Sequence, residues 1–239
     1  MEQVQQQLSK LRLHGMSLRL QALIDTRKVH DLSFADGLQL LLQSEVDERD
    51  NNRFARLRKT AGFRYHASME ELKYDKSRGI DASLISRLAT ADYLRKGESL
   101  LITGATGSGK SFLASALGHH ACVQGYKVLY FNMQKLLLRT KMSRAEGTII
   151  KLFERLAKTD LLILDDFGLT HLDRQQQLDL MEIVEDRHGK KSTLIASQLP
   201  VPSWFEIIGE ETIADAILDR LINTSYRIEL KGESMRKKM

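Results

Sequence analysis

The sequence predicts an α/β protein in which a small helical N-terminal domain precedes a core with a five-stranded parallel sheet. Two observations support this prediction. After residue 98, short apolar runs typical of buried strands alternate with helical patterns, which favours a parallel sheet covered on both faces. Residues 1–90 contain no convincing strand, so we place a helical domain at residues 1–65 and the α/β domain at residues 66–239.

The composition is that of an ordinary globular protein and excludes several kinds of site. The chain has 239 residues, of which 42% are hydrophobic and 28% charged, and its net charge is +5. The single cysteine, Cys122, excludes an internal disulfide framework and a multi-cysteine zinc site. No apolar run is long enough to cross a membrane and the chain begins with polar residues, so we expect a cytoplasmic protein without a membrane partner.

A long helix is predicted after Ser33, which can serve as its N-cap together with Asp36. Apolar residues at helical spacing follow, namely Phe34, Leu38, Leu41, Leu42, Val46, Phe54 and Leu57. The far end of this helix is basic, with the single acid Asp50 among Arg49, Arg53, Arg56, Arg58, Lys59 and Arg64. This pattern has two interpretations, a solvated helix face or a surface that contacts phosphates.

The strands expected in the second domain are Ser99–Thr103, Lys127–Phe131, Leu161–Asp165, Thr193–Ser197 and Arg227–Leu230. Helical patterns separate them at Lys110–Gln124, Ser143–Lys158 and Asp173–His188, and an earlier helix follows Asp81. Ser143 and Glu146 are spaced as a capping box for the second of these helices.

The strongest motif is Gly104-Ala105-Thr106-Gly107-Ser108-Gly109-Lys110-Ser111, which matches the phosphate-loop pattern G-x-x-x-x-G-K-[ST] in full. An apolar strand precedes it and a helical pattern beginning at Phe112 follows it, which is the context that the motif requires. The glycines let backbone N–H groups face a phosphate, and the new helix presents its positive end. We expect Lys110 to reach the β- and γ-phosphates of a nucleotide and Ser111 to bind Mg²⁺.

An acidic pair at the end of the third strand predicts a second part of the nucleotide site. We expect this strand to lie beside the phosphate-loop strand, with Asp165 holding Mg²⁺ directly or through water. Asp166 is the candidate general base, and the alternative is that it caps the following turn. The extra strand between the loop and this acid, without an N-K-x-D guanine-recognition motif, favours an ATP-driven machine over a small GTPase.

Two polar residues later in the chain complete the candidate catalytic set. Gln198, or Ser197 beside it, ends the strand that we expect next to the acidic one, where a polar side chain can meet the γ-phosphate and water. The alternative for these residues is a structural role at the strand end. Arg220 precedes the last strand and can project across a subunit boundary into a neighbour's ATP, or it forms an ordinary salt bridge.

These motifs in this order resemble the IstB-like helper ATPases of bacterial insertion sequences, relatives of the DnaC helicase loaders and DnaA initiators in the AAA+ class. The resemblance runs essentially end to end and is most specific in Ile195–Pro202 and Ile213–Leu221. It implies a P-loop NTPase core of the AAA+ class and ATP-dependent assembly into a homo-oligomer with ATP at subunit interfaces. It also implies largely sequence-independent binding of duplex DNA and delivery of that DNA to a partner transposase.

The resemblance implies roles for single residues as well. Lys110 and Ser111 match the Walker A motif, Asp165 and Asp166 the Walker B pair, Gln198 sensor 1, Arg220 the arginine finger and Arg236 sensor 2. ATP would be bound, with Mg²⁺, by Gly104, Ala105, Thr106, Gly107, Ser108, Gly109, Lys110, Ser111, Phe112 and Arg236. Asp166 stands where many AAA+ proteins carry glutamate, which favours slow hydrolysis that DNA or assembly stimulates.

DNA-binding residues are expected in two places. The helical insertion that contacts DNA in this clade corresponds to Met133–Gly147, with the cations Lys135, Arg139, Lys141 and Arg144. The basic end of the first long helix supplies Arg49, Arg53, Arg56, Arg58 and Lys59. A solvated helix face is the alternative in both places.

Three other functions remain as alternatives. A DnaC-like replicative helicase loader would use the same ATP chemistry, but it would prefer single-stranded DNA and bind a helicase through its N-terminal region. A small-molecule kinase would need a substrate pocket and a mobile lid, for which we identify no segment. A nucleotide-gated scaffold that does not hydrolyse ATP would have no need of Asp165, Asp166 and Arg220.

Overall fold

The computed structural model describes residues 2–72, 74–232 and 234, and the chain forms two compact units, Met1–Arg56 and Leu57–Met239. The division falls inside the helix α3 (Phe34–Ala61), earlier than the boundary after residue 65 that we expected from the sequence. The physical reason is that the residues following α3 pack on the second unit. The ring of Phe63 lies 4.2 Å from that of His119, measured between centroids.

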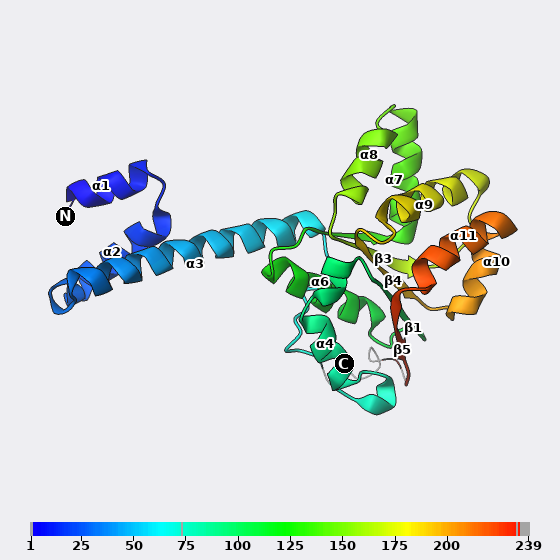
Figure 1. Ribbon diagram of the computed structural model, residues 1–239, viewed down its shortest axis with the longest axis horizontal. Coiled ribbons are helices and arrows are strands. Elements are labelled where there is room, and N and C mark those ends of the chain that lie inside the picture. Colours follow the sequence, from blue (N-terminus) through cyan, green and yellow to red (C-terminus); the bar gives the residue numbers. More distant parts are fainter. Residues whose placement is uncertain (1, 73, 233, 235–239) are drawn as a thin grey trace. The chain divides into compact units, whose positions relative to one another are not determined.

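The first unit is a small group of helices (Figure 1). It contains α1 (Glu2–Lys10), α2 (His14–Asp25), the 3₁₀ helix η1 (Lys28–Asp31) and the first part of α3. Its core consists of Leu8, Met16 and Leu20, against which Leu41 of α3 packs.

The helix start predicted at Ser33 is confirmed, because the Asp36 N–H donates a hydrogen bond to Ser33 Oγ over 3.2 Å. The apolar stripe of α3 is covered only in part. Leu41 packs against the small core, whereas Phe34, Leu38, Leu42 and Val46 have exposed side chains. The periodicity therefore predicted the helix correctly without predicting which apolar residues are buried.

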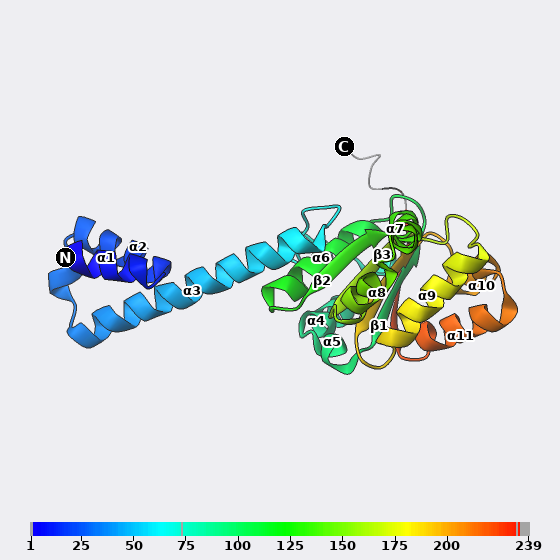
Figure 2. The same cartoon turned by 90° about the horizontal axis from the view of Figure 1, so that it is seen from above.

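The second unit is built on a five-stranded parallel sheet in the order β2-β3-β4-β1-β5, seen in Figure 1 and from above in Figure 2. The strands are β1 (Ser99–Gly104), β2 (Val128–Asn132), β3 (Leu161–Phe167), β4 (Ser192–Ser197) and β5 (Ser225–Leu230). The predicted α/β fold and all five predicted strands are confirmed, with ends that differ by one or two residues.

The expectation that the acidic strand lies beside the phosphate-loop strand was wrong, because β4 lies between β3 and β1. Ile195 of β4 is paired with Leu101 on one side and with Leu164 on the other. The apolar residues in the middle of these strands are buried, so their composition identifies β1, β3 and β4 as central strands without specifying which strands are neighbours. The end of β4 is thereby placed between the phosphate loop and the acidic pair.

Helices cover both faces of this sheet (Figures 1 and 2). α4 (Ala82–Ala89) packs on α6 (Lys110–Val123), which contacts β1, β2, β3 and β4 on one face, and the short α5 (Asp92–Lys96) and η2 (Lys76–Arg78) lie near them in sequence. The other face carries α7 (Met133–Ala145), α8 (Ile149–Ala157), α9 (Arg174–Arg187), η3 (Val201–Ser203), α10 (Trp204–Ile208) and α11 (Glu211–Ile222). Their apolar side chains and those of Leu162, Leu164 and Ile195 form the main core.

The prediction of a capping box at Ser143 was wrong. Ser143 lies inside α7, where its side chain is buried, and its carbonyl accepts the Thr148 N–H over 2.7 Å. Gly147 adopts a φ of 67°, which turns the chain before α8 begins at Ile149. Ser143 lies with Leu136 and Thr140 on the buried face of α7, and burial of this face outweighs the local capping pattern.

Within the described ranges, the helices lack the length and the apolar character that crossing a membrane requires.

A buried arginine at the end of α9 joins the start of β4 to the end of α8 and to the loop that precedes β3. Arg187, the last residue of α9, is 1% exposed. Its guanidinium donates to Thr193 Oγ1 over 3.0 Å, to the Thr159 carbonyl over 2.8 Å, and to the carbonyls of Leu156 and Ser192. Burial lowers the pKa of Arg187, and these acceptors compensate for the loss of hydration.

Replacing Arg187 by leucine is expected to lower the free energy of unfolding of the second unit by about 3–5 kcal/mol, because several buried acceptors lose their donor. The single tryptophan, Trp204, is buried in this unit, so its fluorescence in a urea titration measures the effect. Arg155→Leu changes an exposed side chain of α8 and is the matched control. Equal urea midpoints for the two variants would contradict this role of Arg187.

Candidate nucleotide site

Three parallel strands bring the predicted site residues to one edge of the sheet. Thr103 near the end of β1 is paired with Ser197 of β4, and Ser197 is paired with Phe167 at the end of β3. The loop 104–109, which joins β1 to α6, therefore emerges beside the end of β4. Ligands of parallel α/β sheets bind at this carboxyl edge.

The loop has a backbone conformation that requires glycine. Gly104, Gly107 and Gly109 have φ angles of 143°, 80° and 103°. A Cβ at Gly104 would lie 2.2 Å from the carbonyl oxygen of Leu230 on β5. The close approach of β5 and the left-handed residues together set the loop path, which leads into the amino end of α6, where backbone N–H groups can bind an anion.

Lys110 and Ser111 form the start of α6, as the motif predicted. Lys110 is 7% exposed, and its Nζ donates to the carbonyl oxygens of Gly104 and Ala105 over 2.8 and 2.9 Å. The ammonium group therefore lies on the loop itself. Ser108 Oγ is buried and lacks a hydrogen-bond partner among the described residues, so the loop offers an unused polar group to a ligand.

Gln198 is connected to the phosphate loop by a hydrogen bond. Thr106 Oγ1 donates to Gln198 Oε1 over 2.7 Å, which joins the loop to the residue that follows β4. Ser197 has a different role, because its Oγ donates to the Phe167 carbonyl over 2.8 Å and accepts the Leu199 N–H over 3.1 Å. Of the two candidates, Gln198 is therefore the one that contacts the loop.

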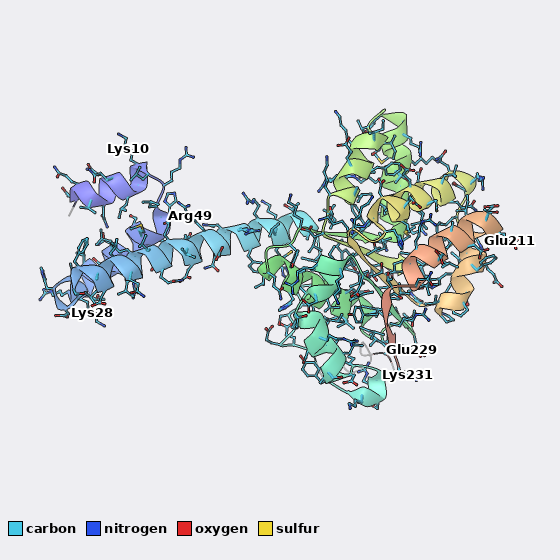
Figure 3. The ribbon with its side chains drawn as sticks, viewed as in Figure 1. Lys10, Lys28, Arg49, Glu211, Glu229 and Lys231 are labelled. Carbon is cyan, nitrogen blue, oxygen red and sulfur yellow. The ribbon has the colours of Figure 1, made fainter. Side chains whose placement is uncertain are left out.

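A segment before α4 supports the loop from the side of β5. Arg78 Nη2 donates to the Ser108 carbonyl over 3.4 Å, and the Arg78 carbonyl accepts the Lys231 N–H over 3.0 Å. A Cβ at Gly79 would lie 1.9 Å from the carbonyl oxygen of Glu229. Glu229 lies near the end of β5 and Lys231 directly follows it, and both are labelled in Figure 3. The sequence analysis missed Arg78 and Gly79, since no local motif distinguishes them.

The two aspartates that end β3 have different surroundings. Asp165 is 1% exposed, and it accepts the Tyr130 hydroxyl at Oδ2 and the Asp166 N–H at Oδ1, the latter over 2.9 Å. Burial and the Asp165 carboxylate raise the pKa of Tyr130, so the phenol remains a donor at neutral pH. Asp166 has a φ of 57°, a left-handed conformation that is uncommon for residues other than glycine.

Asn132 and Arg64 also contact the aspartates, although the sequence analysis gave neither a role in this site. Asn132 follows the apolar part of β2, and its Nδ2 donates to Asp166 Oδ2 over 2.8 Å. Its Oδ1 accepts the Lys135 N–H over 3.4 Å and so caps α7. Arg64 Nη1 donates to the same oxygen of Asp166 over 3.0 Å.

A sequence signal existed for one of these two residues. Asn132 is a polar residue at the carboxyl end of a predicted strand, which is the rule that identified Asp165 and Gln198. Arg64 instead followed the basic end of a long helix, where its sequence neighbours pointed to a solvated or DNA-binding surface. Only the folded chain brings it to residues 165 and 166.

Arg220 lies on α11 and is engaged with α9 in the subunit. Its Nε pairs with Glu185, and its Nη1 donates to the Ala216 carbonyl over 2.9 Å. Phe112 lies in the first turn of α6, as predicted. Arg236, the sensor-2 candidate, lies outside the described residues.

The candidate DNA-binding residues differ in their surroundings. Arg144 Nε donates over 3.0 Å to Asp179, whose side chain is buried, so a structural ion pair accounts for this arginine. Arg49, labelled on α3 in Figure 3, pairs with Glu45 over 2.7 Å, and Arg58 contacts His66. Exposed cations are present at Arg139 and Lys141 on α7, with Lys135 before them, and at Arg53, Arg56 and Lys59 on α3.

The residues at this site fit a nucleotide that carries Mg²⁺. Ser111 and Asp165 supply a hydroxyl and a carboxylate, the hard oxygen ligands that Mg²⁺ prefers alongside water and phosphate. The glycine-rich backbone, the buried Ser108 hydroxyl and the Lys110 ammonium suit the phosphates. No cluster of three or more His, Cys, Asp or Glu side chains able to hold a metal occurs in the described parts of the chain.

Comparison with known proteins identifies relatives along nearly the whole chain. The family model for IstB-like ATP-binding proteins matches residues 6–239. An insertion-sequence ATP-binding protein of Sinorhizobium fredii is 42% identical over 96% of this chain and 94% of its own length. The ATP-binding protein of insertion sequence IS1162 from Pseudomonas fluorescens is 43% identical over 81% of this chain and 84% of its own length.

The fold has counterparts among solved structures. The DnaC helicase loader matches 74% of this chain and 99% of its own with a TM-score of 0.57 and 20% identity. AMPPCP-bound DnaA from Aquifex aeolicus matches 74% of this chain and 54% of its own with a TM-score of 0.60 and 20% identity. These similarities concern the fold alone, and they confirm the predicted α/β core with its five-stranded parallel sheet.

Replacing Tyr130 by phenylalanine is expected to lower the free energy of unfolding by about 1–3 kcal/mol, because the buried carboxylate of Asp165 loses a donor. Urea titration followed by Trp204 fluorescence measures the change. Tyr74→Phe is the matched control, because it removes a hydroxyl from a tyrosine that is 53% exposed. A Tyr130→Phe effect no larger than that of Tyr74→Phe would show that the phenol does not support Asp165.

Proposed function

This chain belongs to the family of IstB-like ATP-binding proteins, and we propose that it is an ATPase that assembles on duplex DNA and recruits a partner transposase. The observation that carries the proposal is the convergence of the phosphate loop, the Asp165–Asp166 pair and Gln198 at one edge of an AAA+ sheet. The transposition role is supported by relatives that are named as insertion-sequence proteins.

In this proposal ATP is bound by the loop backbone and the first turn of α6. Lys110 exchanges its contacts with the loop carbonyls for the β- and γ-phosphates, which are stronger acceptors because they carry charge. Ser111 and Asp165 would hold Mg²⁺, which would supply neutralisation of the phosphate charge. Asp165 can serve this purpose because its buried carboxylate is held in place by Tyr130 and the Asp166 N–H.

Asp166 acts as the general base for hydrolysis in the proposed mechanism. A water attacks the γ-phosphorus, the bond to the β-phosphate oxygen breaks, and the water's proton passes to Asp166. The Asn132 amide orients this carboxylate, and Gln198 leaves Thr106 to meet the γ-phosphate and the water. The aspartate side chain is one methylene shorter than glutamate, so slow turnover suited to a timing switch is expected.

Arg220 is proposed to complete the site of a neighbouring subunit. In the subunit its guanidinium is held by Glu185 of α9, an interaction between partly exposed side chains that is weak in water. The same charge placed against a transferring phosphoryl group would stabilise the transition state. Hydrolysis would then depend on assembly, and the nucleotide would report whether a neighbour is present.

Two separate sets of cations are proposed to contact DNA, the exposed cations of α7 in the second unit and, independently of them, the cations of α3. Arg139 and Lys141 occur on α7, which Asn132 caps at its start. On α3, Arg49, Arg53, Arg56, Arg58 and Lys59 supply further positive charge. Contacts of this type reach phosphates and not base edges, so we expect little sequence preference.

Fluorescence anisotropy with labelled duplex and single-stranded DNA of equal length tests this proposal. We expect duplex binding that requires ATP and falls with added salt, because assembly and phosphate contacts both contribute. Lys110→Ala should lower the affinity for duplex DNA measured with ATP by at least tenfold, since the Lys110 ammonium group stabilises the bound phosphates.

Arg95→Ala is the control for the DNA experiment, because Arg95 pairs with exposed Asp92 away from the loop. A preference for single strands would instead favour a helicase loader. Binding that is the same with and without ATP would contradict nucleotide-dependent assembly.

Arg220→Ala is expected to leave nucleotide binding by the monomer unchanged and to reduce hydrolysis in the assembled state by at least a hundredfold, because the proposed finger acts on the ATP of a neighbouring subunit. Phosphate release at low and high protein concentration, with and without duplex DNA, measures the effect. Arg174→Ala removes a comparable surface pair with Glu210 and should retain activity. Unchanged hydrolysis in Arg220→Ala would eliminate it as the finger.

A further inference from the structure

Arg64 places a positive charge on both aspartates at the end of β3. Its Nη1 lies 3.0 Å from Asp166 Oδ2 and 3.6 Å from Asp165 Oδ2. The Tyr130 hydroxyl, the Asn132 amide and the Asp166 N–H also donate to these carboxylates, and these three donors are neutral. Two adjacent carboxylates repel each other, and the guanidinium offsets that repulsion.

The segment that carries Arg64 is fixed to the helix that begins at the phosphate loop. The Phe63 ring lies 4.2 Å from the His119 ring and 6.3 Å from the Tyr130 ring, measured between centroids. Gly118 of α6 leaves room for it, since a Cβ there would lie 2.5 Å from Phe63 Cε1. Phe63 therefore anchors the backbone beside Arg64, and only the arginine side chain needs to move for the ion pair to open.

A divalent cation and this guanidinium compete for the same place. A metal held by Asp165, directly or through water, requires a carboxylate oxygen and the space in front of it. The Arg64 Nη1 atom lies close to Oδ2 of both residues. Arginine does not lose its proton in proteins, so it can clear this space only by moving away.

We propose that Arg64 is an internal counter-ion of the Asp165–Asp166 pair, and that a divalent cation must displace the Arg64 guanidinium in order to bind. Its side chain is 43% exposed, so it can turn into solvent without a change in the sheet. Release of Arg64 removes one of the contacts that hold the segment 62–66, which directly follows α3, and metal binding is thereby linked to the order of this segment. Linkage of this kind is reciprocal, so the ion pair also raises the metal concentration that the site requires.

Binding of Mn²⁺, measured by electron paramagnetic resonance without nucleotide, tests this proposal in the full chain. Arg64→Gln should bind Mn²⁺ about fivefold more tightly or better, because the competing charge is gone. Arg64→Lys keeps a charge and should stay close to the wild type. Arg58→Gln removes a nearby arginine that contacts His66 and not the aspartates, so it is the matched control.

A merely structural role for Arg64 would change stability but not the affinity for the metal. Equal Mn²⁺ affinity in the wild type, Arg64→Gln and Arg58→Gln, or no measurable binding by any of them, would overturn the proposal. If Arg64→Gln fails to fold, Arg64→Met takes its place, because it keeps the apolar stem without the charge and should bind Mn²⁺ more tightly than the wild type. A tighter affinity of Arg64→Lys would contradict competition by charge.

Hydrogen exchange of residues 62–66 provides a second readout and rests on the proposed function, since it uses nucleotide. Exchange in the wild type should become at least threefold faster with Mg²⁺ and a non-hydrolysable ATP analogue than with the analogue and a chelator. Unchanged exchange despite nucleotide binding would overturn the link to this segment. Failure of the nucleotide to bind would instead overturn the proposed ATPase, while the Mn²⁺ measurement would still decide the role of Arg64.

Discussion

A carboxylate buried at the end of an apolar strand sets the requirements for the whole site. Asp165 is 1% exposed and follows Leu164, which is 0% exposed. An ionised group in such surroundings is costly unless it is paired and hydrogen-bonded. The Tyr130 hydroxyl, the Asp166 N–H and the Arg64 guanidinium meet that requirement from β2, from β3 and from the segment after α3.

The partners of the neighbouring carboxylate connect the site to the surface proposed to bind DNA. The side chain of Asn132 caps α7 with its oxygen and donates to Asp166 with its nitrogen. Because α7 carries the exposed cations Arg139 and Lys141, one amide joins the proposed base to the proposed DNA contact. On the opposite side, the Thr106–Gln198 bond joins the phosphate loop to β4. A bound nucleotide would thus meet side chains that belong to several elements at once.

Local patterns accounted for much of this organisation. The phosphate loop lies between β1 and α6 as predicted, since glycine conformations and strand–helix order are properties of neighbouring residues. The prediction at Ser143 failed for the opposite reason, because burial against the core outweighed a local cap. Arg144 shows the same limit, as its spacing on a basic helix gave no sign of the buried Asp179 that it contacts.

The sequence by itself determined the five strands, the loop that can hold phosphates, and the acidic pair at a strand end, because each depends on the chemistry of a short segment. The tertiary structure alone decided that β4 lies between β1 and β3, that Gln198 rather than Ser197 contacts the loop, and that Arg64 pairs with the aspartates. These features depend on residues far apart in the chain. Their contacts form only when strands with similar apolar surfaces find their order, and no short segment carries that information.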